Sequence, residues 1–185
     1  MGGAKASGAC SIKKGKTIFY GCRFCSSAHA LDLPQKYFDL FPLDSIKLPK
    51  ILKGDANDTF KHTVSSKEDD RSGDRGTKMY DSLVASYGGD RELALKKFVQ
   101  AYLASVASVD DLVGDILEEL KQTGLDKNTI VIFTSDHGWG NGEKDYVYKN
   151  SLWQESTRVP LIIRAPGVSV TSKQCDQPVS LVDLY

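Results

Sequence analysis

Apolar residues recur at intervals of three and four along the segment that begins at Glu92. The repeating positions are Leu95, Phe98, Val99, Tyr102, Leu103, Val106, Val109, Val113, Ile116, Leu117 and Leu120. This spacing forms one stripe on a helix of about 30 residues. Gly124 follows the last apolar position, and glycine is the usual residue just beyond a helix end. The segment therefore predicts one long helix that ends before Gly124.

Two apolar runs follow the predicted helix. The first lies within "KNTIVIFTSD", and the second is "RVPLIIRAPG" at residues 158–167. Both runs are apolar on both faces, which is typical of central strands covered by helices on either side. A long helix that leads into such a strand resembles the second half of a βαβ unit. With 185 residues and 41% hydrophobic composition, the chain is large enough to bury a core. The expected fold class is α/β, a mostly parallel sheet flanked by helices.

The first 78 residues are less regular. Residues 1–16 are rich in Gly, Lys and Ser and predict a poorly ordered N-terminus, whereas residues 16–24 read as a short strand. Prolines at positions 34, 42 and 49 predict turns without long regular elements. Residues 54–78 are polar and poor in aliphatic side chains, which predicts a long exposed connection.

Charge and cysteine content exclude several classes of protein. Lys plus Arg and Asp plus Glu are 24 each, so no overall field favours nucleic acid or an anionic membrane. No run approaches the roughly 18 apolar residues of a membrane span. No apolar segment follows the N-terminal lysines, so no signal peptide is expected. The sequence does not indicate a cellular compartment. The cysteines are too sparse for a disulfide scaffold, and we expect plain thiols rather than zinc ligands at Cys10, Cys22, Cys25 and Cys175.

An Asp-His pair stands where the first apolar run ends, in "FTSDHGWG" at residues 133–140. In open α/β sheets, ligands bind beyond the carboxyl ends of the strands, and Asp136 and His137 lie at that end. Glycines at 138, 140 and 142 allow the backbone to approach a bound group closely.

Lys149 follows at a distance that allows a loop to bring its ammonium back over Asp136 and His137. An ammonium at that place is suited to binding an oxyanion. Aromatic side chains that can exclude water from this place are Trp139, Tyr148 and Trp153. A carboxylate, an imidazole and a cation together indicate a combined metal and anion site.

These motifs in this order resemble the sulfatase family of the alkaline phosphatase superfamily. The resemblance is carried by "TIVIFTSDHGWGNGEKDYVYKNSLWQESTRVPLIIRAPG", by "PVSLVDLY", and upstream by "YLASVASVDDLVGDILEEL" and "AHALDLPQKYFDLFPLDSIKLP". Within that family, it resembles the iduronate-2-sulfatase-like and choline-sulfatase-like branch. It implies an alkaline phosphatase-like fold, with residues 17–185 forming a partial sulfatase domain that holds the middle and later parts of the catalytic domain.

The resemblance also implies roles for individual residues. Asp136 and His137 correspond to two ligands of a divalent ion, usually Ca²⁺, and Lys149 to the lysine that contacts the sulfate group. His29 corresponds to a histidine that faces the sulfate ester; the alternative is an ordinary loop histidine. Calcium prefers oxygen ligands whereas imidazole suits zinc, iron or copper, so the identity of the metal rests on the resemblance.

One part of the family pattern is missing. Sulfatases attack sulfur with a formylglycine made from cysteine in a C-x-P-x-R motif or its serine variant, and no cysteine of this chain stands in such a motif. The paired aspartates expected near the start of the domain are also absent. Asp110 and Asp111 lie within the predicted helix and are interpreted as polar-face or packing groups, and His62 as a solvated surface residue.

The expected function is therefore that of a partial sulfatase, a sulfuric ester hydrolase that acts on a sulfated sugar or a small sulfate ester. Without the nucleophile motif, we expect the isolated chain to be inactive. Two alternatives stay open: a phosphodiesterase or phosphonate hydrolase of the same superfamily, and a non-catalytic remnant that binds sulfated ligands. In the loop, Lys144 is expected to pair with Glu143 or Asp145, and Glu143 to order the loop.

Overall fold

The computed structural model of the chain describes residues 33–59, 75–168 and 173–184. These residues belong to two compact units, one with the described residues 33–47 and 96–115 and the other with the described residues 48–59, 75–95, 116–168 and 173–184. None of the described helices combines the length and apolar composition that crossing a bilayer requires. The predictions for the N-terminus, for the strand at 16–24 and for His29, His62, Cys10, Cys22 and Cys25 lie outside the described residues.

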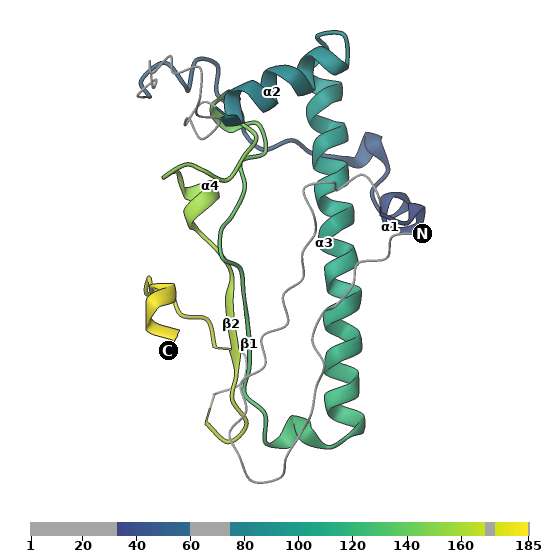
Figure 1. Cartoon of the computed structure of the whole chain (residues 1–185), viewed down its shortest axis with the longest axis vertical. Coiled ribbons are helices and arrows are strands. Elements are labelled where there is room, and N and C mark those ends of the chain that lie inside the picture. The colour runs from purple at the N-terminus through teal and green to yellow at the C-terminus, as the bar shows by residue number, and fades with distance from the viewer. Residues whose placement is uncertain (1–32, 60–74, 169–172, 185) are drawn as a thin grey trace, which may run out of the picture. The chain divides into compact units, whose positions relative to one another are not determined.

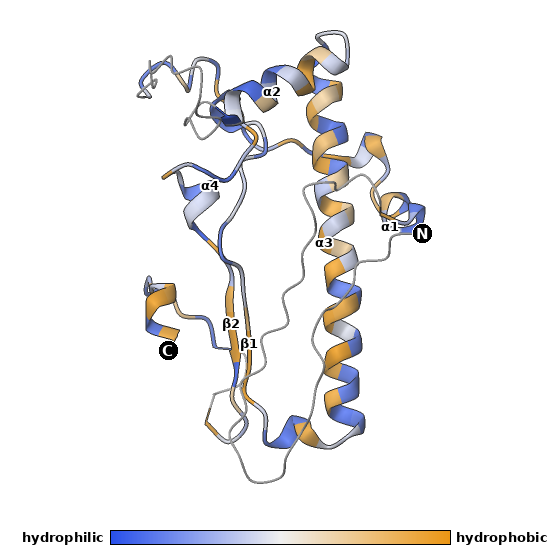
Figure 2. Ribbon diagram, in the orientation of Figure 1, coloured by the Kyte–Doolittle hydropathy of each residue, from blue (hydrophilic) through white to orange (hydrophobic). Residues whose placement is uncertain are grey.

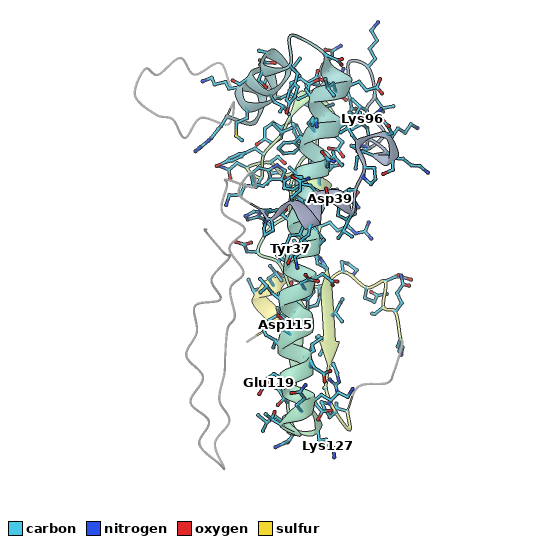
Figure 3. The ribbon with its side chains drawn as sticks, turned by 90° about the vertical axis from the view of Figure 1, so that its right-hand side faces the viewer. Tyr37, Asp39, Lys96, Asp115, Glu119 and Lys127 are labelled. Atoms are coloured by element: carbon cyan, nitrogen blue, oxygen red, sulfur yellow. The ribbon has the colours of Figure 1, made fainter. Side chains whose placement is uncertain are left out.

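The first unit packs two short helical segments against the middle of a long helix. These segments are α1 (Gln35–Asp39) and the 3-10 helix η1 (Leu43–Ser45), and the long helix is α3 (Arg91–Gln122). Tyr37 of α1 lies beside this helix (Figure 3). Its hydroxyl donates to Asp111 Oδ2 at 2.8 Å, and Lys36 Nζ lies 3.1 Å from the same oxygen. Asp111 is more than half exposed and joins α1 to α3 through these two contacts, which agrees with the polar-face role expected for it.

The pKa of Asp111 lies below the ordinary carboxyl value, because the Tyr37 hydroxyl and then the Lys36 ammonium stabilise the carboxylate. These two contacts with Asp111 stabilise the fold at pH values above the ordinary carboxyl pKa. That stabilisation is lost as the pH falls through the lowered pKa of Asp111. We expect Tyr37→Phe to raise the pKa of Asp111 more than Lys36→Met does, measured by NMR titration of the carboxyl. Tyr102→Phe, at an exposed tyrosine of the same helix, should leave that titration unchanged.

Helix α3 confirms the predicted long helix, with 32 residues. The Asp90 carboxylate caps its first turn by accepting from the Leu93 backbone N–H at 3.0 Å. Gly124 follows in the left-handed conformation at φ 69°, which confirms the predicted stop.

The buried face of α3 differs in part from the predicted stripe. Leu95 and Val99 are buried as expected, but Tyr102 and Val106 are exposed. The other buried positions on this helix carry small side chains, namely Ala94, Ala101, Ala104, Ser105 and Ser108. Small residues let neighbouring backbone approach closely, and a pattern based on large apolar residues does not detect them.

The second unit begins its regular structure earlier than the sequence indicated. Helix α2 spans Arg75–Ser86, so the predicted exposed connection at 54–78 is wrong for its last four positions. Gly76 and Tyr80 are its buried residues, and the Gly76 carbonyl accepts from the Val147 backbone N–H at 3.2 Å. Tertiary contact with the later loop thus sets the start of a helix in a sequence that lacks a long apolar stripe.

Strands β1 (Val131–Thr134) and β2 (Leu161–Arg164) form within the two predicted apolar runs. The two strands lie side by side (Figure 1). Their pairing is antiparallel, with Val131 opposite Arg164 and Thr134 opposite Leu161. The expectation of a parallel sheet is therefore wrong for this pair. Parallel neighbours need a crossover, usually a helix, whereas the chain between these strands folds into turns and the four-residue helix α4 (Gln154–Thr157).

The two strands are also more exposed than predicted. Both are strongly apolar (Figure 2), yet Ile162 is 61% exposed and Ile132 and Ile163 are about half exposed. Within the described part of the chain, no element buries them as central strands. The remaining short elements are the 3-10 helices η2 (Leu125–Lys127), η3 (Glu143–Asp145) and η4 (Leu181–Leu184).

Candidate functional site

The loop that leaves β1 folds back on itself through hydrogen bonds from alternate glycines. The backbone N–H of Gly138 donates to Ser156 O at 2.8 Å, and that of Gly140 to Tyr148 O at 2.9 Å. Gly142 N–H donates to Tyr146 O at 3.0 Å, which closes a tight turn over Glu143–Asp145. This arrangement returns the chain so that residue 149 lies beside residue 137.

Two of these glycines are required by their surroundings. A Cβ at Gly138 would lie 2.0 Å from the carbonyl oxygen of Glu155, which is backbone and has little room to move. Gly142 has φ 111°, and a Cβ there would lie 2.7 Å from a methyl carbon of the fully buried Leu95. The close approach and the left-handed conformation explain why the loop uses glycine here.

His137 has a fixed orientation and tautomer. Its Nδ1 lies 2.8 Å from Gly138 O, and because a carbonyl only accepts, Nδ1 carries the proton of the neutral ring. The unprotonated Nε2 lies 3.0 Å from Lys149 Nζ, which donates to it. The same Nε2 lies 3.6 Å from Asp136 Oδ1. The structure thus brings together the three predicted residues that it describes, and the fourth, His29, is outside those residues.

Aromatic rings line one side of this group. Trp139 lies 6.4 Å from the His137 ring and meets Tyr148 edge to face at 5.3 Å. The third predicted ring, Trp153, packs instead against Tyr146 at 5.1 Å. The Trp139 indole N–H is buried and has no hydrogen-bond partner in the described residues. Arg75 lies 5.1 Å above the Tyr148 ring and is a second cation near this group, which no sequence pattern predicted.

The ion pairs of the Glu143–Asp145 turn differ from those expected. Lys144 Nζ pairs with Asp55 Oδ2 at 3.1 Å rather than with a neighbour in the turn, and Asp145 pairs with Arg91 at 2.8 Å. The Glu143 carboxylate accepts from the Asn141 backbone N–H at 2.8 Å, so Glu143 orders the loop as predicted. Neither long-range partner carries a sequence signal, because both lie far from the turn along the chain.

The donor set fits one side of a divalent ion. The Asp136 side chain is 67% exposed and the His137 side chain 33%, and Nε2 is the ring nitrogen that lies near the Asp136 carboxylate. Its lone pair accepts from Lys149 in this structure, so a metal ion would have to replace that hydrogen bond. The described residues contain no cluster of three or more His, Cys, Asp or Glu side chains. Calcium takes six to eight oxygen ligands, so Asp136 and His137 supply at most a part of such a site.

Comparison with known proteins gives consistent results. A family model described as Sulfatase matches residues 52–185. A sulfatase of Formosa agariphila is 37% identical over 155 residues, which are 84% of this chain and 28% of that protein. An endo-4-O-sulfatase of Bacteroides thetaiotaomicron is 46% identical over 88 residues, which are 47% of this chain and 17% of that protein. The iduronate 2-sulfatase of Mus musculus is 42% identical over 86 residues, which are 46% of this chain and 16% of that protein.

The chain thus spans between 16% and 28% of the length of these three relatives. The Asp136–His137 pair, the glycine loop and Lys149 all lie within residues 52–185, the part that the family model matches. Position 29 lies before that part.

Proposed function

We propose, from the premise that this chain belongs to the sulfatase family, that it carries the metal- and sulfate-binding portion of a sulfuric ester hydrolase active site. The observation that supports this proposal is the convergence of three groups at the end of β1. Lys149 Nζ lies 3.0 Å from His137 Nε2, which lies 3.6 Å from Asp136 Oδ1. An ammonium beside a carboxylate and an imidazole suits a tetrahedral anion bound next to a cation.

In this proposal, Lys149 donates to a sulfate oxygen, and Asp136 and His137 hold a divalent ion, Ca²⁺ in the form that the family resemblance implies. Such an ion, when bound, stabilises the charge that develops on the sulfate oxygens. The Gly138 carbonyl accepts from His137 Nδ1, so a metal ion would bind at Nε2, in place of the hydrogen bond from Lys149. His29 is proposed to face the ester oxygen.

The residues of this chain do not supply the nucleophile of a sulfatase. None of the four cysteines stands in the C-x-P-x-R motif that yields formylglycine. We therefore propose that the isolated chain binds sulfate without hydrolysing sulfate esters. The substrate class that we propose is a sulfated sugar, since the relatives include an endo-4-O-sulfatase and an iduronate 2-sulfatase.

Binding is tested by calorimetry on the 185-residue chain, with calcium and then with sodium sulfate in its presence. We expect heat from both, and loss of the calcium signal in Asp136→Asn because the variant loses a charged oxygen ligand. Asp81→Asn removes an equal charge from the exposed side of α2 and should bind calcium normally. Absence of heat in both titrations of the unmodified chain would contradict the proposed function. Inorganic phosphate binding much more tightly than sulfate would favour phosphate-ester chemistry instead.

Turnover is tested with a generic aryl sulfate and calcium. We expect no release of the phenol above the uncatalysed rate, because the chain lacks the motif for the nucleophile. A fusion of this chain to a sulfatase segment that contains C-x-P-x-R, matured to formylglycine, should release it. Hydrolysis by the chain alone would show that another group attacks sulfur.

A further inference from the structure

The Glu143–Asp145 turn has an unusual backbone. Lys144 and Asp145 both have positive φ, at 55° and 54°, which side chains with a Cβ rarely adopt. Two successive residues in this region persist only where surrounding contacts hold them. Each of the two side chains makes such a contact with a different segment of the second unit.

The contact of Lys144 is the more shielded of the two. Its Nζ lies 3.1 Å from Asp55 Oδ2 and donates to Asp55 O at 3.3 Å. The side chains are only 22% and 29% exposed, so solvent screens this pair less than a surface pair. The Lys144 ammonium also lies 5.7 Å from the Trp153 ring centroid.

The contact of Asp145 reaches the first residue of α3. Arg91 donates to Asp145 Oδ1 at 2.8 Å and lies over the Tyr80 ring at 5.6 Å. Both members of this pair are about half exposed, so we rank it below the Lys144–Asp55 pair. The turn is nevertheless held from two directions.

The position of the turn determines where Lys149 lies. The chain leaves Asp145 through Tyr146 and Val147, both buried, and reaches Lys149 two residues later. The hydrogen bonds of Gly142 to Tyr146 and of Gly140 to Tyr148 fix these residues against the strand side of the loop. A displaced turn would therefore displace the Lys149 ammonium from His137 Nε2.

We propose that Asp55 and Lys144, assisted by Arg91 and Asp145, are positioning residues that set the place of the Lys149 ammonium beside His137. The functional role of the Lys149 position rests on the proposed function, in which Lys149 binds sulfate. The placement itself is a property of the chain and can be measured without any ligand.

The test follows the ring nitrogens of His137 by ¹⁵N NMR in the full chain at fixed pH, without sulfate or metal. Lys149→Met removes the donor to Nε2 and defines the spectrum of the lost contact. We expect Asp55→Asn to move the His137 signals toward that spectrum, and Asp55→Asn with Arg91→Gln to move them further. Lys144→Gly, which accepts the positive φ but loses the ion pair, should move them as Asp55→Asn does. Lys144→Arg should keep the unmodified spectrum because it keeps the pair.

The matched control is Asp126→Asn, which breaks the Arg164–Asp126 pair of the same unit, 3.3 Å long, a pair that includes no residue of the turn. It should leave the His137 signals unchanged. The proposal is overturned if Asp55→Asn and Lys144→Gly, folded by amide spectra, keep the unmodified His137 spectrum, or if Asp126→Asn shifts it equally. If the double variant does not fold, the two single variants decide the matter. A chain that shows these shifts but binds no sulfate would refute the proposed function and leave the positioning role standing.

Discussion

Replacing Lys149 with Met is expected to weaken binding of inorganic sulfate by about tenfold or more, the usual effect of removing a hydrogen bond to a charged group. Lys149 is half-buried and its ammonium lies 3.0 Å from His137 Nε2, so it stands beside His137 at the proposed anion site. Calorimetric titration of the full chain with sodium sulfate in the presence of calcium measures the change.

The control for charge is Lys127→Met, which removes an exposed lysine of the same unit. It should change sulfate affinity little, because an exposed charge remote from the site is screened by salt. Equal weakening in the two variants would mean that sulfate responds to net charge alone, and the assignment of Lys149 would be wrong.

Replacing Gly138 with Ala is expected to destabilise the chain by about 1–3 kcal/mol, as overpacking of a tightly packed position does. The new Cβ would lie 2.0 Å from Glu155 O, so the backbone must move and the Gly138–Ser156 hydrogen bond must lengthen. The same movement carries His137 away from Lys149, so sulfate binding should weaken as well. Urea denaturation gives the stability, and calorimetry gives the affinity.

Gly114→Ala is the matched glycine control. Gly114 lies within α3, and a Cβ there meets no atom of the described residues within 4 Å, the backbone of its own helix aside. Alanine in a helix interior is more stable than glycine by about 0.5–1 kcal/mol, so this variant should gain stability and keep sulfate affinity. A Gly138→Ala variant with the stability and affinity of the unmodified chain would contradict the close contact on which the site geometry depends.

Local pattern sufficed for some elements and failed for others. The 3.6-residue periodicity and Gly124 predicted α3, because helix hydrogen bonds and apolar stripes are both local. The start of α2 at Arg75 was missed, since it depends on contact between Gly76 and the loop at Tyr146 and Val147. The direction of β2 relative to β1 was predicted wrongly, because the apolar pattern of a strand does not show whether its neighbour runs parallel or antiparallel to it.

The amino-acid sequence by itself determined the long helix, the places of the two strands, the glycine loop and three chemistry-bearing side chains, because spacing and residue type encode these directly. Only the tertiary structure decided the antiparallel pairing of β1 and β2, the tautomer of His137 and its contact with Lys149. It also decided the pairing of Lys144 with Asp55 and of Asp145 with Arg91. These features join residues far apart in the chain, and their geometry follows from how the backbone returns rather than from any local pattern.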